Sequence, residues 1–70
     1  MRIRLSDPAS LDDLADYLRE CGCIADPLGA GELEVFQLRS PNEHAERMEV
    51  GVYLTAWRSQ HPGVTAEIVE

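Results

Sequence analysis

The cysteine pair Cys21 and Cys23, separated by one glycine, is the stretch of this sequence whose side chains are best suited to chemical reactions. Thiols at this spacing raise three hypotheses: a redox-responsive pair, part of a metal site, or small apolar side chains at the end of a helix. A thioredoxin-type pair has two residues between its sulfurs, and a disulfide across one residue is strained. A structural zinc ion needs four ligands, and the other candidates, His44 and His61, each stand alone. The spacing therefore favours structural cysteines and predicts no metal site.

The glycine between the cysteines predicts where the first helix ends. Asp7 can cap a helix whose first residue is Pro8. Apolar residues then recur with the spacing of one helical face, at Leu11, Leu14, Ala15, Leu18 and Cys21. Gly22 suits the left-handed conformation that commonly follows a helix. We therefore predict that Cys21 is the last helical residue and that the next cysteine packs back on the helix.

General acid or base catalysis would require a histidine or a carboxylate poised in a pocket. His44 falls in the first turn of a second predicted helix and His61 in its last turn, where we expect both to be solvated. The carboxylates of the first helix predict a solvated face; they are Asp12, Asp13, Asp16 and Glu20. No catalytic residue is assigned, and the sequence favours a protein that is not an enzyme and needs no cofactor.

The second helix has the sharpest start signal in the chain. Ser40 as N-cap, Pro41 at the first helical position and Glu43 form a capping box. A Pro-Gly pair ends this helix near Gln60. Besides its inward face, the helix carries a second apolar stripe formed by Met48, Val52 and Ala56.

Four stretches have the residue pattern of β-strands, and they alternate with the two helices. The predicted order is strand, helix, strand, strand, helix, strand, over residues 1–5, 8–21, 23–27, 33–39, 41–60 and 64–70. In this pattern the chain resembles the ferredoxin-like superfold, βαββαβ, with a four-stranded antiparallel sheet and two helices on one face. We predict one α+β domain over residues 1–70. The resemblance implies regulatory domains, metallochaperones, RNA-binding domains or small dimeric enzymes as functional classes.

Charge and motifs argue against several of these classes. The formal charge of −7 repels phosphate backbones, so we expect no nucleic-acid partner. Metallochaperones of this topology carry Cys-x-x-Cys after the first strand, where this chain has Ser6, Asp7 and Pro8. No stretch resembles a signal peptide or a membrane span, so we expect a cytoplasmic protein with reduced thiols and no membrane partner.

The sheet face that the helices leave uncovered is the strongest candidate for an interface. Arg2 and Arg4 can pair there with glutamates of neighbouring strands. The same face carries apolar side chains at Ile24, Phe36, Leu38 and Val69, and the outer helix stripe adds Met48 and Val52. These eight residues are the predicted interface, although an ordinary solvated sheet is an alternative of equal weight.

Two functional hypotheses from different classes follow. The first is a small acidic protein-interaction or regulatory module without catalytic activity, which forms a homodimer through its open sheet face or docks another protein. The alternative is a small-molecule-binding or catalytic dimeric domain whose pocket forms at the dimer. A lesser alternative is an acidic inhibitor that mimics nucleic acid, because several carboxylates lie on the first helix.

Overall fold

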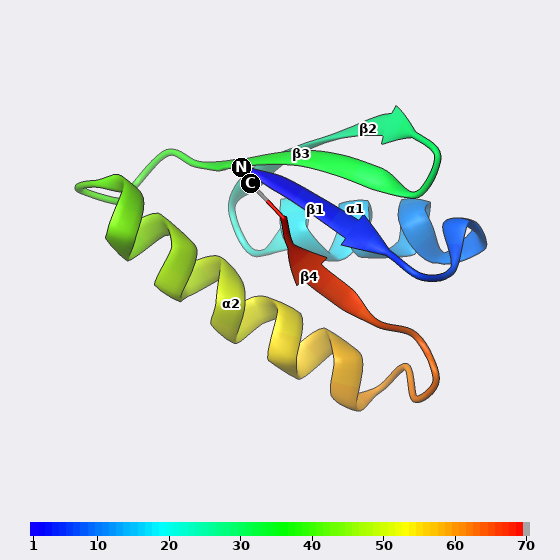
Figure 1. Cartoon of the computed structure of the whole chain (residues 1–70). Coiled ribbons are helices and arrows are strands. Elements are labelled where there is room, and N and C mark those ends of the chain that lie inside the picture. The colour runs from blue at the N-terminus through cyan, green and yellow to red at the C-terminus, as the bar shows by residue number, and fades with distance from the viewer. Residues whose placement is uncertain (70) are drawn as a thin grey trace.

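The computed structural model describes residues 1–69 (Figure 1). The elements are β1 Arg2–Leu5, a short 3₁₀ helix Pro8–Ser10, α1 Leu11–Glu20, β2 Cys23–Gly29, β3 Glu32–Gln37, α2 Glu43–Ser59 and β4 Ala66–Ile68. The strands form one antiparallel sheet in the order β2-β3-β1-β4. The predicted α+β class, with a four-stranded antiparallel sheet and two helices, is confirmed.

The core lies between one face of the sheet and both helices. In β1, Ile3 and Leu5 are buried while Arg4 between them is exposed, which is the alternation of a half-buried strand. Both helices contribute to the same apolar cluster, so they cover the same side of the sheet, with α1 behind the strands in Figure 1. The cluster comprises Ile3, Leu5, Leu11, Leu14, Ala15, Leu18, Cys23, Ala25, Leu33, Val35, Val50, Leu54, Trp57 and Ala66.

The first helix begins and ends close to the predicted residues. Asp7 accepts a hydrogen bond from the backbone N–H of Ala9, 3.1 Å away, and caps the 3₁₀ helix that leads into α1. At the other end, Gly22 has a φ of +93°, the left-handed conformation that the sequence predicted. The regular helix stops at Glu20, one residue before the predicted end, because Cys21 is its C-cap.

The predicted capping box at the start of α2 is wrong. Asn42 is the N-cap, and its Oδ1 accepts from the backbone N–H of Ala45 at 2.8 Å. The Ser40 hydroxyl instead donates to Glu49, 3.2 Å away and well inside the helix. Asn and Ser cap equally well, so the choice is made by tertiary contacts. Glu46, also within α2, holds the preceding strand by accepting from the backbone N–H of Gln37 at 2.8 Å.

Three of the strands differ from the prediction by at least two residues at one end. β2 extends to Gly29, and a turn with a left-handed Ala30 (φ 52°) joins it to β3. β3 ends at Gln37, so Leu38 lies beyond the regular strand. β4 covers only Ala66–Ile68 of the predicted 64–70, and residue 70 lies outside the described residues.

Candidate functional site

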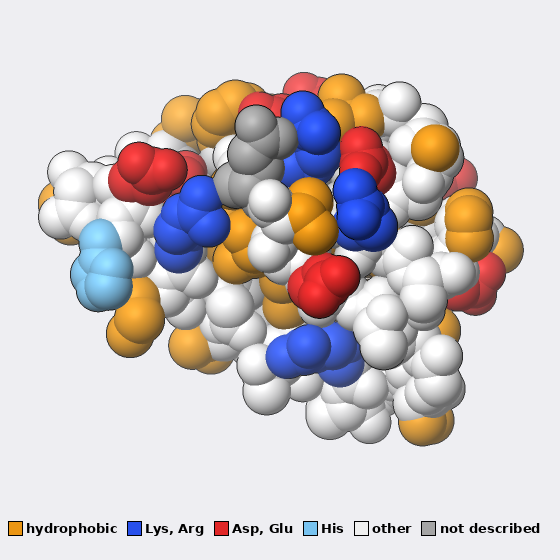
Figure 2. Space-filling view, viewed as in Figure 1, with side chains coloured by type: hydrophobic (Ala, Val, Ile, Leu, Met, Phe, Trp, Pro, Cys, Tyr) orange, Lys and Arg blue, Asp and Glu red, His pale blue; other side chains and the backbone are white. Residues whose placement is uncertain are grey.

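The middle of the open sheet face is charged and internally neutralised. Arg4 donates to the carboxylate of Glu32 with its Nε at 3.2 Å and its Nη2 at 2.9 Å. The Arg2 guanidinium lies 4.0 Å from the same carboxylate, and the N-terminal amino group lies 3.9 Å from Glu34. Figure 2 shows basic and acidic side chains side by side on this face. The sequence anticipated glutamate partners but missed Glu32, which the register places opposite Arg4.

An apolar corner lies beside this charged strip, formed by Ile24, Phe36 and Leu38. Ile24 and Phe36 are cross-strand neighbours in β2 and β3, and they are 41% and 44% exposed. Leu38, just after β3, is 72% exposed. Val69 does not join this corner, because it lies on the far side of β1, where its N–H donates to the carbonyl of Arg2.

Both edges of the sheet are blocked by an arginine from a helix. On the β2 edge, Arg19 of α1 donates to the outward carbonyl of Ala25 with Nε at 3.1 Å and Nη2 at 2.6 Å. On the β4 edge, Arg58 of α2 donates to the carbonyl of Ala66 at 3.3 Å. Pro27 removes a further edge donor in β2. Strand addition is therefore obstructed at both edges, and contacts with other chains are directed to the faces.

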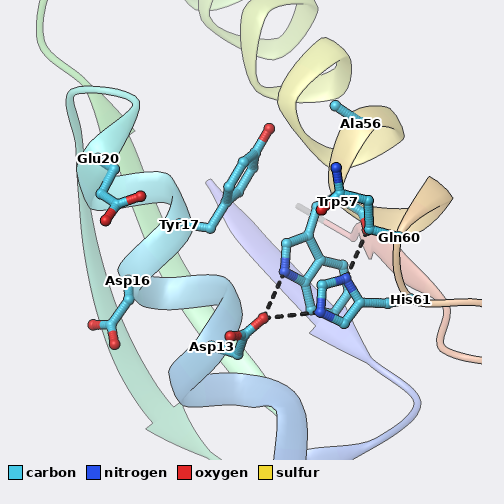
Figure 3. Close-up of a pocket in the computed structure, with 8 residues that line it drawn as sticks. All are labelled: Asp13, Asp16, Tyr17, Glu20, Ala56, Trp57, Gln60 and His61. Atoms are coloured by element: carbon cyan, nitrogen blue, oxygen red, sulfur yellow. Dashed lines mark hydrogen bonds and ion pairs between the residues drawn. The ribbon is translucent and has the colours of Figure 1, made fainter.

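A groove of about 460 Å³ separates α1 from α2 (Figure 3). In it, one carboxylate oxygen of Asp13 accepts from Trp57 Nε1 at 3.1 Å and lies 3.0 Å from His61 Nε2. The His61 ring stacks on the indole at 3.9 Å between centroids, and its Nδ1 lies 2.8 Å from the carbonyl of Trp57. The remaining lining residues are Asp16, Tyr17, Glu20, Ala56 and Gln60.

This arrangement corrects the prediction that Asp13 and His61 are simply solvated. A carbonyl oxygen only accepts hydrogen bonds, so the Nδ1 of His61 donates to Trp57 and Nε2 is directed at the carboxylate of Asp13. Neither ring nitrogen is left over for a substrate. The cluster links the two helices, and the sequence signal for it was a buried indole, which requires an acceptor for its N–H.

The two cysteines occupy different environments. Cys23 is 6% exposed, and burial, with smaller contributions from Cys21, Glu46 and Glu49, raises the pKa of its thiol to about 11. Cys21 is half-buried, and both thiols are free. Burial, with a smaller contribution from Cys21, also raises the pKa of the Tyr17 hydroxyl. A thiol with a raised pKa is a poor nucleophile at neutral pH, and the burial of Cys23 agrees with the packing predicted for it.

The outward side of α2 is a third exposed surface. Met48 and Val52 are 62% and 66% exposed, and they border a shallow apolar hollow of about 590 Å³. The hollow is lined by Arg47, Met48, Gly51, Val52, Thr55 and Ala56. The eight predicted interface residues therefore do not form one surface. They divide among the charged strip (Arg2 and Arg4), the apolar corner, Val69 and the outer side of α2.

Residues 1–69 contain neither a cluster suited to a metal ion nor a membrane-spanning helix. Within residues 1–69, no three His, Cys, Asp or Glu side chains gather in a set that could hold a metal ion. None of the helices in that range has both the length and the apolar composition to span a membrane. Comparison with protein-family models, curated proteins and solved structures gives no match for this chain.

Proposed function

We propose that the protein is a small acidic protein-interaction or regulatory module that works by contact with proteins rather than by catalysis. The apolar corner of the open sheet face is the contact surface for another protein. One observation carries this proposal: Ile24, Phe36 and Leu38 are exposed together on a sheet whose two edges are both blocked. Such a surface is available to a partner that docks face-on.

The electrostatics of the sheet face support a protein partner rather than an anionic ligand. Arg4 is already engaged by Glu32, and Arg2 lies within reach of the same carboxylate. An anion would have to compete with these carboxylates. The overall charge of −7 likewise supports a partner other than nucleic acid.

We also propose that the chain has the ferredoxin-like superfold and is located in the cytoplasm. The strand order β2-β3-β1-β4, with both helices contributing to one core, supports assignment to the ferredoxin-like superfold. Two free thiols in a single 70-residue domain support a reducing compartment, the cytoplasm. We retain both as part of the proposal.

Small-molecule binding is the second candidate function, and the groove between α1 and α2 favours it. The groove is formed within one chain, so binding there would not require a dimer, unlike the pocket expected from the sequence. Its aromatic side chains, Tyr17, Trp57 and His61, offer apolar contact beside carboxylates. The nucleic-acid mimic is less well supported, because Asp13 and Asp16 are engaged by His61 and Arg19 within the chain.

A matched pair of variants tests the proposed function. Phe36→Glu places a charge in the apolar corner, whereas Leu28→Glu places the same charge at an exposed leucine near the end of β2 in the same sheet. We expect proteins captured from native cytoplasm by the wild type to be lost with Phe36→Glu and retained with Leu28→Glu. Identical capture by all three would contradict the proposal. A thermal shift produced by small molecules, unchanged by Phe36→Glu, would support the second candidate instead.

A further inference from the structure

His61, which follows α2, lies between two groups that can only accept hydrogen bonds. Its Nδ1 is 2.8 Å from the carbonyl oxygen of Trp57, and its Nε2 is 3.0 Å from a carboxylate oxygen of Asp13. A neutral imidazole carries a proton on one nitrogen, whereas the protonated ring donates from both. An ionised carboxylate has no proton to donate. The two hydrogen bonds can therefore form together only when the ring of His61 carries its second proton.

The carboxylate of Asp13 faces donors on both sides when that proton is present. The oxygen next to His61 also accepts from the indole N–H of Trp57, at 3.1 Å, and Figure 3 shows both contacts meeting at this carboxylate. If the ring were neutral, the lone pair of Nε2 would lie 3.0 Å from the negatively charged oxygen, and the two would repel each other. Loss of the second proton therefore opens the contact between Asp13 and His61, while the indole keeps its acceptor.

The charges around His61 favour the protonated ring. The ring lies just beyond Gln60, the C-cap of α2, where the negative end of the helix dipole stabilises a cation. Arg58 of α2 donates instead to a carbonyl of β4, and Arg19 of α1 is engaged by β2 and by Asp16. Among the described residues, those that line the groove include no lysine or arginine. Besides His61, the titratable groups of the groove all come from α1; they are Asp13, Asp16, Tyr17 and Glu20.

We propose that His61 is a pH-sensitive latch between α2 and α1. With its second proton, the ring joins the end of α2 to Asp13 of α1, and without that proton the joint opens. The hydrogen bond between Asp13 and Trp57 persists in both states, so the helices stay packed and only the groove between them loosens. Because the contact favours the protonated ring, the latch adds stability at low pH and loses it as the pH rises through the histidine range, about pH 5 to 8.

The chain contains a spectroscopic probe of this latch and a matched control for it. Trp57 is the only tryptophan of the sequence, and the ring of His61 stacks on its indole with 3.9 Å between centroids. A protonated imidazole at this contact quenches indole fluorescence more strongly than a neutral one. His44 is the only other histidine of the sequence, and it is exposed in the first turn of α2. His44→Gln therefore removes a titrating ring and leaves the cluster intact, whereas His61→Gln removes the latch itself.

Tryptophan fluorescence followed from about pH 5 to about pH 8 tests the proposal. We expect the fluorescence of the wild type and of His44→Gln to increase alike as the pH rises, and that of His61→Gln to show no transition in this range. Asp13→Asn keeps an acceptor for the indole of Trp57 but removes the negative charge, so its transition should shift to lower pH. A transition that persists in His61→Gln, that is absent from the wild type, or that does not move in Asp13→Asn would overturn the latch.

A second measurement uses the wild type alone. Nitrogen NMR of the imidazole rings should show both nitrogens of His61 protonated at a pH where His44 has already lost its second proton. Loss of the second proton from both rings at the same pH would refute the proposal. The latch goes beyond the proposed function, since it lies among the helices and the apolar corner lies on the uncovered face of the sheet. The capture experiment with Phe36→Glu and Leu28→Glu therefore decides the proposed function separately.

Discussion

Helix α1 buries four of its ten residues, whereas α2 buries only three of its seventeen, so α2 offers far more surface outside the core. The two outward faces also differ in kind. α1 turns Asp12, Asp16 and Glu20 toward solvent, and Asp16 is paired with Arg19 at 3.2 Å. The outward side of α2 instead exposes Met48 and Val52 beside a hollow whose lining includes one charged side chain, Arg47. The difference shows that α1 exposes charged side chains, one of them paired within the helix, while the outward side of α2 leaves large apolar side chains exposed.

The largest expected effect separates the buried face of α1 from the exposed side of α2. Leu18→Ala removes a fully buried side chain of α1 and should lower the free energy of unfolding by about 2–5 kcal/mol. Met48→Ala, on the exposed side of α2, should change it by less than about 0.5 kcal/mol. Urea denaturation of both variants at low protein concentration checks this. Equal losses would mean that Met48 supports the monomer's own core.

The next effect concerns the link between the helices. Asp13→Ala leaves the Trp57 indole N–H without its acceptor and breaks the contact with His61. We expect a loss of about 1–2 kcal/mol in the free energy of unfolding. Asp12→Ala, the adjacent exposed carboxylate in the same turn, is the control and should cost about 0.5 kcal/mol or less. If the two variants lose the same stability, the cluster does not join the helices.

The cysteines after α1 should differ in reactivity and in their effect at high pH. Cys21 is half-buried and should be alkylated in the native protein at pH 8, whereas Cys23 should react only on unfolding.

Because burial raises the pKa of Cys23 to about 11, the folded state favours the neutral thiol. Its contribution to stability is complete below its ordinary pKa near 9 and is lost as the pH rises toward 11. Cys23→Ala should remove this part of the pH dependence, while equal alkylation of both thiols would refute the buried site.

The smallest effects on stability should come from the arginines that block the sheet edges. Arg19→Ala and Arg58→Ala should each lower the free energy of unfolding by about 1 kcal/mol or less, since one neutral carbonyl loses a charged donor. Arg19→Ala should be the more aggregation-prone variant in light scattering, because it exposes the longer edge strand. Stable, aggregation-free samples of both variants would show that the arginines do not protect the edges.

Patterns within one element were sufficient to predict most of the fold. The residue pattern predicted a strand at β1, helical spacing predicted the inner face of α1, and Gly22 predicted the end of α1. The N-cap of α2 was predicted wrongly because two nearby residues can both cap a helix. Both Ser40 and Asn42 are good caps, and the contact between Ser40 and Glu49 inside the helix leaves the cap to Asn42.

Features that join distant segments were not accessible from the sequence. The contact between Asp13 and Trp57 spans 44 residues, so no local spacing indicates it. The contact between Arg58 and the carbonyl of Ala66 was also not predictable. Ala66 lies on an edge strand, and the direction of its carbonyl depends on the register of that strand with β1. The sequence already divided the predicted interface residues between the open sheet face and the outer helix stripe. The exposure of each side chain and the distance of Val69 from the apolar corner required the three-dimensional arrangement.

The proposed contact surface is tested most directly by the capture of proteins from native cytoplasm with the wild type, Phe36→Glu and Leu28→Glu. We predict that the wild type and Leu28→Glu capture the same proteins and that Phe36→Glu loses them. Identical capture by all three would contradict the claim that the apolar corner of the open sheet face is a contact surface for another protein.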